Sequence, residues 1–139
     1  MTYPKPIFET IVRCSDIDLK LSPERHQLDI PHGIWLEFFT QLTHDNRECL
    51  ITLQLLDRQM GNFDLLRHKP LFSVIYDRPN YGNDLVVTVS RSLRGHEATY
   101  AHRIVYPQTV GIITNEDGVI LSCTVTDDDH AQTVISFQS

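Results

Sequence analysis

Hydrophobic and polar residues alternate with two different periods, and these periods divide the chain into one helical segment and a long series of strands. Between residues 29 and 45, apolar residues recur three or four positions apart, which is the spacing of one face of an amphipathic helix. Asp29 ahead of Pro31 is typical of a helix start. We therefore expect a helix over 29–45 that packs on a large apolar surface. The apolar face consists of Ile34, Trp35, Phe38, Phe39 and Leu42.

From residue 50 to residue 137 the period changes to two. Short runs rich in β-branched and aromatic residues are separated by turn-forming residues, which is typical of strands. No helical pattern interrupts them, so we expect an antiparallel sheet. The segment Asn115–Gly118 reads as a hairpin turn. Pro107 predicts a bend, a bulge or a sheet edge, because proline cannot donate to a strand ladder.

The first 28 residues give weaker signals. Residues 1–6 contain two prolines and predict a loose tail, whereas residues 7–14 alternate and predict an edge strand. Residues 15–28 mix turn formers with charges and predict a connecting loop. Together these patterns predict a single domain over 1–139 of class α+β. Its main amphipathic helix is expected to pack on a bent, mainly antiparallel β-sheet or a small, partly open barrel.

Composition and charge limit the classes of function. The chain has 139 residues, 41% of them hydrophobic, which is enough for one core. Its net charge of −6 opposes non-specific attraction to nucleic acid and anionic membranes. No stretch approaches the roughly 20 apolar residues of a membrane span, and the N-terminal prolines are atypical of a signal peptide. We therefore expect a soluble protein that binds neither membranes nor nucleic acid.

The cysteines are odd in number and widely spaced, at Cys14, Cys49 and Cys123. This spacing implies neither a disulfide framework nor a zinc ribbon, and a reducing cytoplasm fits it best. The sequence also lacks a nucleophile elbow, a phosphate-binding loop and a dinucleotide glycine fingerprint. We accordingly assign no catalytic residue, no metal and no cofactor.

The acidic run Asp127–Asp129, followed by His130, is the first candidate for chemistry. Alternating residues on both sides predict that this run is the tip of a hairpin. Adjacent side chains on a tight turn diverge, so we do not expect the three carboxylates to converge on one ion. The run also lacks the alternating acids, central glycine and distal glutamate of a calcium loop. We therefore interpret it as a solvated turn rather than a divalent-metal site.

Two groups of residues are candidates for binding. Tyr100, His102 and Tyr106 could line a small-molecule pocket in which His102 acts as acid or base, although a half-buried, hydrogen-bonded histidine explains His102 as well. Arg67 and Lys69 are either solvated loop charges or, with Arg91 and Arg94, a patch for an anionic partner. Nucleic-acid binding through the same cations is the weakest alternative.

Several of these segments together resemble a family of small bacterial and archaeal proteins known as a domain of unknown function. The resemblance rests on the tryptophan helix "IPHGIWLEFFTQLT", on the strands "LFSVIYD" and "DLVVTV", and on the closing segment "DDDHAQTVISF". It also includes a His-x-Ile-x-x-Pro element at His102, Ile104 and Pro107. The resemblance supports the fold and implies no activity. A looser similarity to Sm-type domains, with a helix before a bent barrel, provides an alternative fold.

The function hypothesis from sequence is a non-catalytic protein-binding or assembly module. The chain carries a well-patterned scaffold, no catalytic signature and edge strands that could pair with a protein partner or a second copy. Pairing of an edge strand with a second copy would give a homodimer. The alternative is a small-molecule-binding protein or small enzyme with a pocket near His102.

Overall fold

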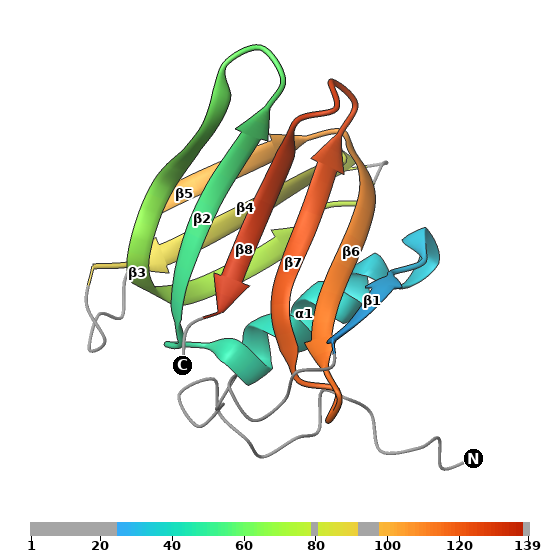
Figure 1. Ribbon diagram of the computed structural model, residues 1–139, viewed down its shortest axis with the longest axis vertical. Coiled ribbons are helices and arrows are strands. Elements are labelled where there is room, and N and C mark those ends of the chain that lie inside the picture. The colour runs from blue at the N-terminus through green and yellow to red at the C-terminus, as the bar shows by residue number, and fades with distance from the viewer. Residues whose placement is uncertain (1–24, 79–80, 92–97, 138–139) are drawn as a thin grey trace.

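The computed structural model describes residues 25–78, 81–91 and 98–137. These residues form eight β-strands, one α-helix and a single turn of 3-10 helix before it (Figure 1). The helical elements are the 3-10 turn His32–Ile34 and α1 (Trp35–Asn46). The strands are β1 (Arg25–Asp29), β2 (Leu50–Asp57), β3 (Gly61–Tyr76), β4 (Asp84–Ser90), β5 (Ala98–Val105), β6 (Pro107–Asn115), β7 (Ile120–Asp127) and β8 (Gln132–Phe137).

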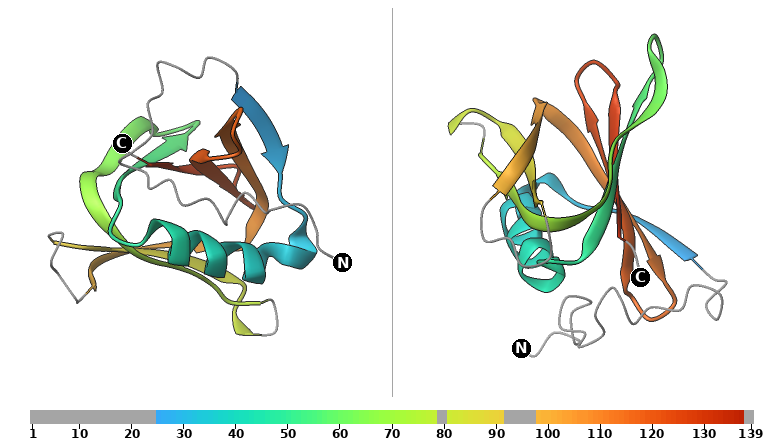
Figure 2. Two further views of the ribbon diagram at one scale, coloured as in Figure 1. Left: turned by 90° about the horizontal axis from the view of Figure 1, so that it is seen from below. Right: turned by 90° about the vertical axis from the view of Figure 1, so that its left-hand side faces the viewer.

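All eight strands belong to one antiparallel sheet in the order β1-β6-β7-β8-β2-β3-β4-β5. The 16-residue β3 pairs with β2 along its first part and with β4 along its last, so the sheet turns a corner along this strand (Figure 2). Register shifts opposite β2 and β4 accompany the bend. Because β1 and β5 end the order without pairing with each other, the sheet is open. The predicted α+β class with a bent antiparallel sheet is confirmed, and the closed Sm-like barrel is not adopted.

Helix α1 lies beside the corner of the sheet and packs on β3 (Figure 2). The side chains predicted for its apolar face include Trp35, Phe38, Phe39 and Leu42, each at most 2% exposed. They join one hydrophobic core with residues from the sheet. The indole of Trp35 also donates a hydrogen bond of 2.9 Å to the carbonyl of Ile30, which holds the chain that enters the helix. The core therefore joins both parts of the bent sheet through the helix.

The N-terminal boundary of the helix differs from the prediction. Asp29 is the last residue of β1, and no side chain caps α1, which begins at Trp35. The expected connecting loop over 15–28 is wrong for Arg25–Leu28, which pair with β6. Pro31 favours extended backbone in the residue before it, so the strand and the helix are separated at this point. The turn-forming residues of this segment predicted a loop, whereas β1 forms because it pairs with β6, which is distant in the sequence.

The structure also extends the expected strand "LFSVIYD" towards the N-terminus. Arg67 and Lys69, which we expected in a loop, lie within β3. His68 between them adopts a φ of 53°, which locally interrupts the regular alternation of the strand. This irregularity explains why the segment has no period-two pattern in the sequence. The expected edge strand over 7–14 lies outside the described residues.

The hairpin and proline predictions are confirmed. Asn115–Gly118 connects β6 to β7, with Gly118 at a φ of 83°. Pro107 is the first residue of β6, and a register shift follows it. Cys123 is a free, buried thiol, whereas Cys49 is disulfide-bonded, which the cysteine spacing did not predict. Among the described residues, no helix has the length and hydrophobicity to cross a membrane.

Candidate functional site

The three residues predicted to share a pocket occupy different positions along β5. Tyr100 and His102 lie within β5, and Tyr106 follows its end at a φ of 52°. Six residues of extended chain span about 20 Å, so Tyr100 and Tyr106 are too far apart to hold one small ligand. Tyr106 is 52% exposed, whereas His102 is half-buried. The three residues therefore do not form a single site.

His102 makes a contact between the two parts of the bent sheet. Its Nε2 lies 3.1 Å from the hydroxyl of Thr133 on β8, and Thr133 is itself buried. Desolvation lowers the pKa of His102, because burial disfavours the charged imidazolium. A neutral imidazole hydrogen-bonded to a buried hydroxyl matches the structural interpretation of this residue. Its possible role as acid or base stays a prediction.

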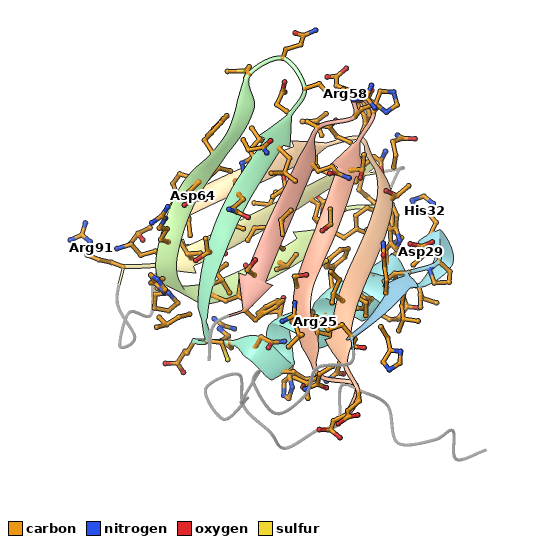
Figure 3. All side chains as sticks on the ribbon, in the orientation of Figure 1. Arg25, Asp29, His32, Arg58, Asp64 and Arg91 are labelled. Carbon is orange, nitrogen blue, oxygen red and sulfur yellow. The ribbon has the colours of Figure 1, made fainter. Side chains whose placement is uncertain are left out.

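Two of the predicted binding residues do converge. Lys69 of β3 and Tyr100 of β5 line one cavity of about 300 Å³ at the end of β4. Arg91, which follows β4, also lines this cavity, and Figure 3 shows it at the margin of the sheet. Among the described residues neither Lys69 nor Arg91 is in an ion pair. We call this site the Lys69–Arg91 cavity.

Arg67 is excluded from this cavity by an ion pair of its own. Its guanidinium bonds the carboxylate of Asp64, which also accepts a hydrogen bond of 3.0 Å from the side chain of Gln54. These two hydrogen bonds, first that from Gln54 and then that from Arg67, lower the pKa of Asp64. Arg67 and Lys69 therefore belong to different local environments, although they are two positions apart in the sequence.

Within residues 25–78, 81–91 and 98–137, β5 pairs with β4 on one side and ends the sheet on the other, so its outer edge is a further surface, the free edge of β5. The amide of Tyr106 donates to the carbonyl of Asn83, and the register continues with Asp84 opposite Val105. In an antiparallel ladder hydrogen-bonded and non-hydrogen-bonded pairs alternate. It follows that Tyr100, His102 and Ile104 bond to β4. The outward N–H and C=O groups belong to Ala101, Arg103 and Val105.

The side chains at this edge are exposed and contain little charge. Ala101, Arg103 and Val105 are all exposed, and Val105 is 45% accessible. Arg103 forms an ion pair of 3.2 Å with Asp84 on the neighbouring strand, which offsets its charge locally. The strand contains no proline and no lysine, which are the residues that commonly protect sheet edges. The edge of β5 can therefore accept a further strand.

The opposite edge of the sheet, β1, differs in length and charge. It has five residues, and all of them are exposed. Three of the five, Arg25, His26 and Asp29, are charged or titratable. Short, polar edge strands resist the addition of another strand. Of the two ends of the sheet, β5 is the one suited to pairing.

The acidic run forms the tip of the β7–β8 hairpin, as predicted. One carboxylate oxygen of Asp127 accepts hydrogen bonds from the amides of Asp129 and Ala131, at 2.9 and 3.0 Å. His130 adopts a φ of 66° within the turn. Contrary to the expectation that these carboxylates diverge, Asp127, Asp128 and Asp129 can each present an oxygen within 4.8 Å of the others. Exposed acids at this spacing are common in turns, and the backbone bonds of Asp127 account for its position.

Two features were missed by the sequence analysis. A polar cavity of about 380 Å³ lies between the β2–β3 and β7–β8 hairpins, lined by residues that include Arg58 and His130. The buried phenol of Tyr76 lies 3.2 Å from Nε2 of His32 and donates to the side chain of Asn83 at 3.3 Å. Burial raises the pKa of Tyr76. Both groupings join segments far apart in the chain, so no local pattern could have indicated them.

The comparisons with known proteins identify a family and no activity. No curated protein matches the chain, and no solved structure matches it. One family model covers most of the chain, including α1 and all of the sheet from β2 to β8. Residues 26–139 match the model of the family of unknown function DUF5335, and the chain therefore belongs to this family.

Proposed function

We propose that this protein is a non-catalytic assembly module that pairs with a second copy of itself through the free edge of β5. The observation that carries the proposal is a row of outward backbone groups at Ala101, Arg103 and Val105, at an edge of eight residues that no proline or lysine protects. Strand addition at such an edge obtains its affinity from main-chain hydrogen bonds.

A symmetric pair fits the sequence of this edge. In a two-fold antiparallel arrangement centred on His102, Ala101 would face Arg103 of the second copy, and Thr99 would face Val105 of the second copy. The two copies of Arg103 would therefore avoid each other. The pairing would join the two bent sheets into one continuous sheet and would shield both exposed edges.

A proline at position 101 tests the proposal. Ala101 directs its amide away from β4, so Ala101→Pro removes an outward donor without removing a bond of the β4–β5 ladder. In a symmetric pair both copies lose one hydrogen bond, which is about 1–3 kcal/mol in total and weakens association roughly 5- to 150-fold. Sedimentation velocity over a range of concentrations measures this change.

Two control variants separate the edge of β5 from general effects. Ala101→Ser keeps the amide and should pair like the natural chain. Gln27→Pro places proline at the other edge, because the bond from Ile30 to Val110 sets a register in which Gln27 directs its amide outward. The Gln27→Pro variant should therefore also associate like the natural chain. A natural chain that stays monomeric at every concentration, or a folded Ala101→Pro variant that associates as strongly as the natural chain, refutes the proposal.

A further inference from the structure

We propose that the Lys69–Arg91 cavity binds a small organic carboxylate that has a compact apolar body. Its volume of about 300 Å³ is at the lower end of the range for small-molecule sites in proteins. At ~30 Å³ per water this is space for roughly ten water molecules. A small organic acid, rather than a nucleotide or an extended chain, matches this size.

The cations of the cavity determine the charge of the ligand. Lys69 of β3 and Arg91, which follows β4, meet at one cavity in a chain whose net charge is −6. No carboxylate among the described residues pairs with either of them. Other basic side chains nearby in the sequence have partners, such as Arg67 with Asp64 and Arg103 with Asp84. An anionic ligand would supply the countercharge that the described part of the chain does not.

The remaining lining residues define the rest of the ligand. The half-buried Leu66 provides an apolar surface, and Val89 lines the cavity with 1% of its surface exposed. Three hydroxyl-bearing residues, Ser90, Thr99 and Tyr100, line the same cavity. A guanidinium donates two parallel hydrogen bonds to the two oxygens of a carboxylate, and an ammonium adds a point charge. The combination favours an oxyanion attached to an apolar group over a free inorganic anion.

The probe for this proposal is 3-phenylpropionate, and its neutral amide is the matched control. Titration of the full chain, followed by two-dimensional NMR of the backbone amides, should shift the signals of Leu66, Lys69 and Arg91 with the acid and not with the amide. Lys69→Gln and Arg91→Gln should each weaken binding roughly tenfold, because each removes a hydrogen bond to a charged group. Arg58→Gln, an exposed arginine on the distant β2–β3 hairpin, should have no effect (Figure 3).

Three results would overturn the proposal. The first is the absence of saturable shifts at these residues with the acid. The second is equal binding of the acid and the amide, because charge would then have no part in recognition. The third is inorganic phosphate competing as strongly as the organic acid, since the apolar surface would then contribute nothing. The proposal does not depend on pairing through β5, so the Ala101→Pro variant should bind the probe as the natural chain does.

Discussion

Removing the side chain of Leu42 tests the account of how α1 holds the bent sheet together. Leu42 is 0% exposed and lies on the helix face that packs in the core shared with β2 and β3. Leu42→Ala deletes the equivalent of three methylene groups, which is about 2.4 kcal/mol of transfer free energy at ~0.8 kcal/mol each. A cavity remains because the surrounding side chains relax incompletely, which brings the expected loss to about 3–4 kcal/mol.

Trp35 provides the signal for this measurement. It is the single tryptophan of the chain and is 1% exposed, so its fluorescence should change when the core opens. With an m-value of about 2 kcal/mol per molar urea, a loss of 3–4 kcal/mol lowers the midpoint of unfolding by roughly 1.5–2 M. The matched control is Ile34→Ala just before the helix, because Ile34 is 47% exposed and should lose less than about 1 kcal/mol.

A loss below about 1 kcal/mol for Leu42→Ala would contradict this reasoning, because a fully buried leucine in a close-packed core cannot be removed at so small a cost. Equal losses at Leu42 and Ile34 would also contradict it. Such a result would show that the helix is not oriented with Leu42 towards the sheet.

Three other predictions concern single side chains. Burial lowers the pKa of His102 below its unfolded value of about 6.5, so the free energy of unfolding should be highest above that pH and should fall as the pH drops below it. Urea titrations at pH 7.5 and 5.5 measure this fall, which His102→Gln should reduce. An equal fall in the variant would argue against burial of His102. Burial raises the pKa of Cys123 to about 12, so a thiol reagent at pH 8 should label Cys123 only after the protein unfolds. Peptide mapping detects the label, and rapid labelling of the native protein would contradict the burial of this thiol. Asp127→Ala should lower the free energy of unfolding by about 1 kcal/mol or more, because the amides of Asp129 and Ala131 lose their acceptor. Asp128→Ala should have little effect. Equal losses for the two variants in urea unfolding would contradict this prediction.

The sequence predicted those elements that local patterns determine. The helix face with Trp35, Phe38 and Leu42 follows from a three-to-four-residue period, and the later strands follow from alternation. The position of β1 could not be predicted in this way, because its five exposed residues carry no apolar period and are held by pairing with β6. The irregular backbone at His68 likewise concealed the first half of β3.

The candidate sites depend still more on contacts between distant segments. Tyr100 and Lys69 were selected as separate features, and the bend along β3 brings them to one cavity. Arg91 was noted only as a further basic residue, since nothing in its neighbourhood indicates which strand it meets. The free edge of β5 follows from the order of the strands, which hydrophobic alternation does not specify.

Hydrogen exchange of the β5 amides tests the central claim most directly. At concentrations low enough to keep the protein monomeric, the amides of Ala101, Arg103 and Val105 should exchange rapidly, whereas those of His102 and Ile104 should be protected by β4. At high concentration the three outward amides should become protected as β5 pairs with a second copy. Uniform protection along the strand at low concentration, or outward amides that stay unprotected in an associated form, would contradict the claim that β5 is the pairing edge.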